Sequence, residues 1–345
     1  MRYSAILLSC LIAASLNVYA NDKIKLSVFY SNLTSELNRT FNSHLRQYGT
    51  DTNISFMTQD AQYDSHKQQF QISSDIDEGD CTLVVTSSRE VATTALNKSM
   101  NKDKTIIFYS KHPPISIRAY DKAWFVGAND SMAGKLQAEM IKDYFISKKN
   151  QDKNRNKMVD YILLRGEKNT KDANDRTAAM ISAMLSYGYE MNPVSEYYAD
   201  WRSKPARLNV TNILKKHGPE NVEVIIANND EMALGAIEAL QDIGFNKGNP
   251  DKYIPVFGID GISKAKTAID NGIMTGTVYA DIDGMAKACI QIASQQEISE
   301  KKLSEAISVP VENHSVIFPY YSYAKFKYYP RDAADNNYWQ QVTKW

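Results

Sequence analysis

Apolar segments with the period of strands alternate with segments of helical period along most of the chain. Residues 24–30 alternate apolar and polar positions and then become wholly apolar, as a partly buried strand does, whereas Leu37, Phe41 and Leu45 recur at helical spacing. The same patterns predict further strands at 54–57, 81–86, 105–109, 124–127, 159–164, 195–199, 222–227, 254–259 and 275–279. They predict further helices along 132–144, 178–185, 231–241 and 285–293, and another that follows the strand at 254–259 and ends near residue 271.

This order of elements predicts an α/β fold with two doubly wound parallel-sheet lobes. Strands that alternate with helices form parallel sheets that are covered by helices on both faces. The strand–helix units are more numerous than one compact sheet usually holds. If residues 1–20 are removed, 345 − 20 = 325 residues remain, a length for which two domains are the natural expectation.

Residues 1–20 have the three parts of a secretory signal. Arg2 gives a basic start, residues 5–14 are apolar but too short to span a bilayer, and Val18-Tyr19-Ala20 offers a cleavage site. The alternative is a buried N-terminal helix. We expect export to a bacterial periplasm and a soluble mature chain, because no later stretch reaches the length of a membrane span.

The balance of charge and the absence of several motifs exclude some classes of partner and of enzyme. Removing Arg2 leaves 40 − 1 = 39 basic residues against 40 acidic ones, a balance that argues against nucleic acid. No Gly-rich phosphate loop, zinc-ligand spacing or Gly-x-Ser-x-Gly elbow appears.

The remaining cysteines, Cys81 and Cys289, either form a disulfide or are buried thiols, and the sequence leaves both alternatives open.

Polar residues follow several of the predicted strands, at the edge where ligands of such sheets bind. They are Ser110, Asn228-Asn229-Asp230, Asp260, and Gly166-Glu167 with Asp172 and Arg176 just beyond. Taken singly, each has a simpler explanation, because Asn and Asp cap helices and Asp172 and Arg176 have the spacing of an i,i+4 ion pair. Together they surround one crevice with amides, carboxylates and a guanidinium.

This set of groups suits a carbohydrate. Asp and Asn accept from or bridge sugar hydroxyls, and Arg donates in a fixed fork. Trp201 follows a strand and has the polar neighbours Asp200 and Arg202, so we expect its ring to stack on the apolar face of a sugar rather than to fill the core. The same acids would suit a glycosidase, which is the enzymatic alternative.

Several motifs resemble the galactose/glucose-binding periplasmic proteins, a pentose/hexose branch of the type I binding proteins. The segments that carry the resemblance are 120–127, 163–167 with Asp172 and Arg176, 224–240, 254–260 and 276–278. The family implies a non-enzymatic, monomeric protein that hands a sugar to an ABC permease. A sensory protein that presents the sugar to a chemoreceptor or histidine kinase is the alternative.

The resemblance also implies lobe boundaries. Three hinge strands should cross near residues 128–129, 280–281 and 318–319. A signal would then occupy 1–20, the first lobe 21–128 plus 280–317, and the second lobe 129–279 plus 318–345. The aromatic segment after Tyr320 lies beyond the resemblance, and we expect it to pack on the second lobe rather than to dock a partner.

The resemblance carries over sugar-contacting roles to five residues of the second lobe: Asp172, Arg176, Trp201, Asn229 and Asp260. The first lobe departs from the family. An Asp and a stacking Phe are missing near residues 31–34, Ser110 replaces an Asn in the ligand-binding set, Thr170 replaces a His, and Ala280 replaces a hinge Asn. Because an unpaired buried hydroxyl costs about 1–3 kcal/mol, these changes predict weaker binding of glucose or galactose, or a different ligand.

A calcium loop is the second feature that the resemblance implies. Asp152, Asn154, Asn156, Met158 and Asp160 stand at the alternating positions of such a loop, and Glu223 matches its distant bidentate ligand. Oxygen ligands of this kind suit a hard cation. Lys157 occupies the sixth position, where Gly normally makes the turn. A solvated polar loop without metal is the alternative.

Overall fold

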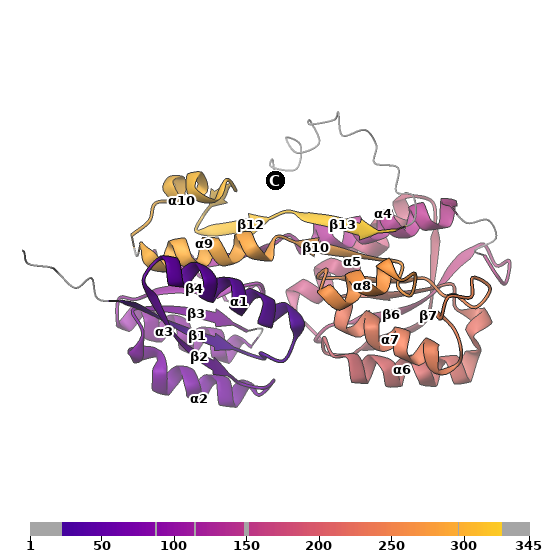
Figure 1. Ribbon diagram of the computed structural model, residues 1–345, viewed down its shortest axis with the longest axis horizontal. Coiled ribbons are helices and arrows are strands. Elements are labelled where there is room, and N and C mark those ends of the chain that lie inside the picture. Colours follow the sequence, from indigo (N-terminus) through magenta and orange to yellow (C-terminus); the bar gives the residue numbers. More distant parts are fainter. Residues whose placement is uncertain (1–22, 87, 114, 148–151, 296, 326–345) are drawn as a thin grey trace, which may run out of the picture.

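The computed structural model describes residues 23–86, 88–113, 115–147, 152–295 and 297–325. These residues form two α/β lobes that lie side by side (Figure 1). The expected signal at 1–20 lies outside the described residues. None of the helices in the described ranges is long and apolar enough to cross a membrane.

Each lobe is built on one sheet. The first sheet has the order β11-β12-β5-β4-β3-β1-β2 and the second has the order β13-β10-β9-β8-β6-β7. The strands of the first sheet are β1 (Ile24–Tyr30), β2 (Ile54–Asp60), β3 (Cys81–Val85), β4 (Thr105–Tyr109), β5 (Ala123–Ala128), β11 (Val311–Glu312) and β12 (Ser315–Phe318). The strands of the second are β6 (Met158–Arg165), β7 (Glu190–Tyr198), β8 (Val224–Ala227), β9 (Val256–Ile259), β10 (Gly276–Ala280) and β13 (Tyr320–Ala324).

Helices cover both faces of both sheets. The first lobe carries α1 (Glu36–Asp51), α2 (Ser65–Asp75), α3 (Arg89–Asn101), α9 (Ile282–Ser294) and α10 (Glu300–Ile307). The second carries α4 (Asp130–Ser147), α5 (Lys171–Ser186), α6 (Ser203–His217), α7 (Asp230–Asp242) and α8 (Ser263–Asp270). The fold class predicted from the sequence, two doubly wound lobes, is therefore confirmed.

The central strands are apolar on both faces, as buried parallel strands must be. In β1, Val28 packs in the cluster with α1 and α9, whereas its neighbour Phe29 packs on the opposite face with α2 and α3. In β6, Leu163 faces α4 and α5, and Ile162 faces the cluster of α6, α7 and α8. Successive side chains point to opposite faces, so each strand ties two helical layers together.

The chain passes between the sheets three times. It leaves the first sheet after Ala128 and enters α4, returns after Ala280 into α9, and crosses again between Phe318 and Tyr320. The third crossing continues into β13, which pairs antiparallel with β10. The three crossings place the ends of all central strands along one cleft between the lobes.

The structure adds elements that the sequence patterns did not define. They are α2, α3, α6 and α10, the short strands β11 and β12, and β13 in the aromatic C-terminal segment. Tyr320 and Tyr323 pack on the second lobe, as expected of the aromatic segment, while 326–345 lie outside the described residues. Cys81 and Cys289 are free, buried thiols, which resolves the alternative that the sequence left open.

The close approach of α4 to α5 depends on Gly134. A Cβ at this position would lie 2.2 Å from the carbonyl oxygen of Arg176 on α5, which is backbone and cannot give way. We predict that Gly134→Ala destabilises the protein by about 1–3 kcal/mol in urea unfolding. Lys135→Ala on the exposed side of the same helix should change stability by less than about 0.5 kcal/mol, and equal effects of the two substitutions would contradict this account.

Candidate functional site

The six residues predicted from the sequence to bind the ligand line one cavity between the lobes. The cavity has a volume of about 70 Å³. From the second lobe it is lined by Asp172, Arg176, Trp201, Asn229, Glu231 and Asp260. From the first lobe it is lined by Ser31, Asn32, Ser35, Leu37, Asn38, Tyr63, Val85, Ser110 and Lys111. Contact of these residues with a ligand remains a prediction.

Arg176 is buried at the base of the cavity and is held by four groups. Its Nε donates to Asp130 Oδ1 at 2.8 Å, and its Nη1 donates to the carbonyl oxygen of Asn228 at 2.7 Å and to Asp260 Oδ1 at 3.5 Å. Its Nη2 donates to the Tyr320 hydroxyl at 3.1 Å. Four of its five N–H groups are thereby engaged, and one on Nη2 forms no hydrogen bond to any residue that the structure describes.

Asp172 does not form the i,i+4 ion pair with Arg176 that the spacing allowed. The i,i+4 ion pair of α5 is Lys171 with Asp175 instead. Asp172 is 7% exposed, and within the described residues its carboxylate accepts no hydrogen bond. The carboxylate lines the cavity, so Asp172 is a natural acceptor for hydroxyl groups.

Asp260 is also nearly buried, at the end of β9. Burial raises the pKa of its carboxyl to about 7, against the opposing effect of Arg176. Its backbone φ is 121°, a conformation that L-residues rarely adopt. The strained backbone aims the carboxylate at Arg176 and at the cavity.

Trp201 is placed by an unusual turn after β7. Asp200 and Trp201 both have positive φ, 51° and 63°. The indole packs so closely on Gly166 that a Cβ there would lie 2.0 Å from Trp201 Cζ2. The Lys111 ammonium and the Arg176 guanidinium lie 5.4 and 5.5 Å from the ring centroid. The turn and the glycine therefore fix an aromatic plate on the cavity wall.

Asn229 serves the helix and the tryptophan at once. Its Oδ1 accepts from the backbone N–H of Met232 at 3.0 Å, so the capping explanation is correct for this oxygen. Its Nδ2 donates to the carbonyl oxygen of Trp201 at 3.3 Å. Asn229 thus links the start of α7 to the turn that carries the indole.

The first lobe supplies groups that the sequence analysis missed. Tyr63, in the loop after β2, brings an aromatic ring to the cavity, and Leu37, at the start of α1, brings an apolar side chain. The Lys111 ammonium lies 3.3 Å from Glu167 of the second lobe. Lys111 directly follows Ser110 after β4, so the rule that pointed to Ser110 could have found it. Nothing in the local sequence marks Tyr63.

Further contacts hold the two lobes together around the cavity. Glu231 of α7 accepts from the backbone N–H of Glu36 at 3.3 Å, and Glu36 accepts from the backbone N–H of Ser263 at 2.7 Å. The guanidinium of Arg202 lies 5.7 Å from the ring centroid of Tyr63. Each glutamate caps the start of a helix in the opposite lobe, an arrangement that the helix dipole favours. The structure therefore presents the closed arrangement of the lobes.

The predicted calcium ligands lie together at the start of β6. Asp152 accepts from the backbone N–H groups of Asn156 and Lys157, both at 3.0 Å. Asn154 and Asn156 accept from the backbone N–H groups two residues further on, at 3.1 and 2.8 Å. Lys157 has a φ of 65°, the left-handed conformation that Gly normally supplies. The backbone turns therefore form despite the lysine.

The side chains of this loop bond to one another. Amide N–H groups of Asn154 and Asn156 donate to Asp160 Oδ2 at 2.7 and 2.8 Å, and Glu223 accepts from the backbone N–H groups of Lys153 and Asp160 at 2.6 and 3.2 Å. Within the described residues, no group of three or more His, Cys, Asp or Glu side chains is placed to hold a metal. The donor types fit a hard cation, but two amides present nitrogen rather than oxygen.

Comparison with known proteins agrees with this architecture. A family model described as a periplasmic binding protein domain matches residues 27–301. The D-galactose/methyl-galactoside binding periplasmic protein MglB of Haemophilus influenzae is 29% identical over 230 residues, 66% of this chain and 67% of that protein.

Two solved structures share the fold. The Caulobacter myo-inositol binding protein has a TM-score of 0.72 at 17% identity, covering 88% of this chain and 93% of that one. An ABC transporter periplasmic solute binding protein of Actinobacillus succinogenes, solved with D-allose, has a TM-score of 0.70 at 20% identity, covering 87% and 97%. The chain belongs to the family of periplasmic binding proteins. It is a binding protein and not an enzyme, as the resemblance implied.

The raised pKa of Asp260 predicts a pH dependence of stability. The folded protein holds this proton up to about pH 7, whereas the unfolded chain releases it near its ordinary pKa of 3.8. The contribution of Asp260 to stability is therefore fully present below about pH 4 and is lost as the pH rises through about 7. Asp260→Asn, which is neutral at every pH, should remove this dependence.

The measurement is the difference in free energy of unfolding between wild type and Asp260→Asn, from urea unfolding at pH values between 4 and 8. The wild type should lose stability relative to the variant as the pH rises, by at most about 1.4 kcal/mol per pH unit. A wild type that instead gains stability relative to the variant as the pH rises would mean that the Arg176 ion pair lowers the pKa of Asp260.

Proposed function

We propose that this protein captures a monosaccharide, galactose-like or glucose-like, in the periplasm and delivers it to an ABC permease. The observation that carries the proposal is the Asp172 carboxylate, which accepts no hydrogen bond within the described residues and lines the interlobe cavity together with Arg176 and Trp201. The family and the galactose-binding relative support the same conclusion.

The side chains of Asp172, Arg176 and Trp201 match the hydroxyl donors, the hydroxyl acceptors and the apolar ring face of a sugar. Hydroxyls would donate to Asp172 and accept from the remaining N–H of Arg176. The apolar face of a pyranose ring would cover the indole of Trp201, which is buried against Gly166 on its other side. Hydroxyls and one apolar face distinguish sugars from amino acids and from inorganic anions.

Lys111 controls how much of the cavity is available. The volume of about 70 Å³ is below the roughly 300–1,000 Å³ of typical ligand sites. The Lys111 ammonium lies over the same indole that a sugar would cover, and its side chain is 19% exposed. We infer that a bound sugar displaces Lys111 from Trp201.

A thermal-shift screen of hexoses, pentoses and their derivatives tests the proposal, because a ligand that binds the folded state raises the melting temperature. At least one monosaccharide should do so. Trp201→Ala and Asp172→Ala should each weaken its binding by about tenfold or more, ~1.4 kcal/mol. The matched control is Asp175→Asn, which removes a carboxylate of α5 that does not line the cavity. Failure of every sugar to stabilise the protein would exclude the proposed function.

We also propose that the loop at 152–160 holds Ca²⁺ together with Glu223. The alternating oxygen donors and the completed backbone turns support this. The Oδ1 atoms of Asn154 and Asn156 would keep these backbone hydrogen bonds and bind the ion through their second lone pairs. Burial raises the pKa of Glu223, so a nearby cation would stabilise its ionised form. Calcium suits this set better than magnesium, because it tolerates six to eight oxygens in irregular geometry.

Such an ion would tie the start of β6 to the strand that follows Glu223 and would add stability without touching the sugar. A chelator should therefore lower the melting temperature, and calcium should restore it. Glu223→Gln should abolish the response while leaving sugar affinity nearly unchanged, whereas Glu220→Gln, an exposed neighbour, should retain it. A melting temperature that responds to neither chelator nor calcium would show that the loop works as a metal-free turn.

A further inference from the structure

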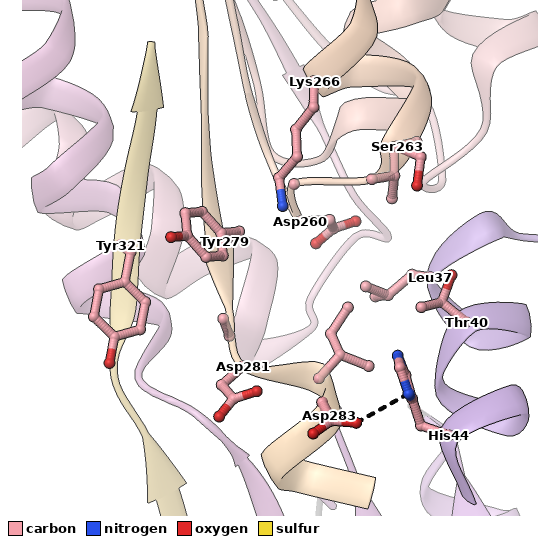
Figure 2. A pocket seen from close by; sticks show the side chains of 14 residues that line it. Leu37, Thr40, His44, Asp260, Ser263, Lys266, Tyr279, Asp281, Asp283 and Tyr321 are labelled. Atoms are coloured by element: carbon pink, nitrogen blue, oxygen red, sulfur yellow. Dashed lines mark ion pairs between the residues drawn. The ribbon is translucent and has the colours of Figure 1, made fainter. Parts of the chain in front are cut away.

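A second and larger cavity lies beside the first, on the side of the hinge crossings. Figure 2 shows the side chains that line it, among them Leu37 and Asp260. Its volume is about 380 Å³, and these two residues also line the cavity at Trp201. One wall is α1 of the first lobe, and the opposite wall is the segment from Gly261 to Lys266 of the second. The hinge strands β10 and β13 close the third side.

The lining of this hinge-side cavity has the groups of a carbohydrate site. Tyr279 and Tyr321 lie opposite each other on β10 and β13, with ring centroids 5.5 Å apart. The Lys266 ammonium lies 4.4 Å from the Tyr279 centroid, and within the described residues it forms no ion pair. Asp281 binds the backbone N–H of Gly284 through Oδ1 at 2.9 Å. Its Oδ2 accepts no hydrogen bond within the described ranges, so the cavity offers aromatic faces, a donor and an acceptor together.

We propose that the galactose-like or glucose-like unit is captured as part of a disaccharide or similar glycoside, whose first ring covers Trp201 and whose second ring occupies the hinge-side cavity. This rests on the proposed function, whose monosaccharide becomes the first ring, and extends the substrate class to sugars that carry a second ring. The linkage between the rings would pass between Leu37 and Asp260, the two residues that border both cavities.

The sizes of the two cavities support this assignment. The hinge-side cavity falls within the usual range of roughly 300–1,000 Å³ for ligand sites, whereas the cavity at Trp201 is far smaller. A ring between α1 and α8 would also contact both lobes and two of the three crossings. It would therefore add contacts that exist only when the lobes are closed, and these would offset the first-lobe contacts that the sequence lacks.

The test compares monosaccharides with disaccharides by calorimetry. The probes are D-galactose and D-glucose, and the disaccharides lactose, melibiose, cellobiose and maltose. At least one disaccharide should bind about tenfold or more tightly than the monosaccharide at its non-reducing end. Tyr279→Ala should weaken disaccharide binding by about tenfold and leave monosaccharide binding within about twofold.

Two further variants sharpen the comparison. Thr40→Trp should fill the hinge-side cavity from α1 and exclude the second ring while sparing the first. Tyr197→Ala removes an exposed tyrosine from β7, at the opposite edge of the second sheet from β13, and should change neither affinity.

The outcomes separate this inference from the function on which it rests. Monosaccharides that bind as tightly as every disaccharide, or a Tyr279→Ala variant that weakens both equally, would overturn the second-ring site and leave the sugar-binding function intact. Failure of all six sugars, together with an empty thermal-shift screen, would instead remove the proposed function itself.

Discussion

The arrangement of the cleft depends on one buried guanidinium. Arg176 is 8% exposed and contacts Asp130 just after the first crossing, Tyr320 just after the third, and Asp260 at the end of β9. Removing one partner of a buried ion pair typically costs about 3–5 kcal/mol, because the other charge remains without compensation. These three segments must therefore keep their positions relative to α5, and Arg176 organises the hinge as well as the ligand cavity.

The aromatic wall of the cavity depends on backbone rather than on charge. Trp201 needs the bare backbone of Gly166 behind its ring and the amide of Asn229 on its carbonyl. Both lie at the ends of neighbouring strands of the same sheet, so the sheet sets their spacing. The second lobe therefore carries a preorganised half-site, in which bound sugar would find its partners already oriented.

The sequence predicted the fold, and it predicted that the second-lobe candidates lie at one cleft, because both follow local rules; their contact with a ligand stays a prediction. Apolar segments with the period of strands predicted the strands, and their alternation with helices predicted the parallel sheets. The polar residues after β8 and β9 were found from the rule that ligands bind at the carboxyl ends of parallel strands. Asp130, Tyr63 and Tyr320 were not found, because their roles come from the crossings and from lobe closure, which bring together residues far apart in sequence. The spacing of Asp172 and Arg176 suggested an ion pair, but tertiary partners replaced it: Arg176 has three contacts outside α5 that are within 3.1 Å.

The two lobes contribute unequally to the cleft, and this has a physical consequence. The second lobe presents carboxylates, a guanidinium and an indole, while the first presents Leu37, the Tyr63 ring, the Lys111 ammonium and the uncharged polar side chains of Ser31, Asn32, Ser35, Asn38 and Ser110. A ligand bound first to the second lobe would gain uncharged polar contacts and the Tyr63 ring on closure at Trp201. Contacts between the lobes, such as Glu36 with Ser263, and whatever fills the space between α1 and α8 would add to the free energy of closure. Because a ligand shifts a conformational equilibrium only by its difference in affinity for the two states, the hinge-side cavity is where selectivity for a closed complex can arise.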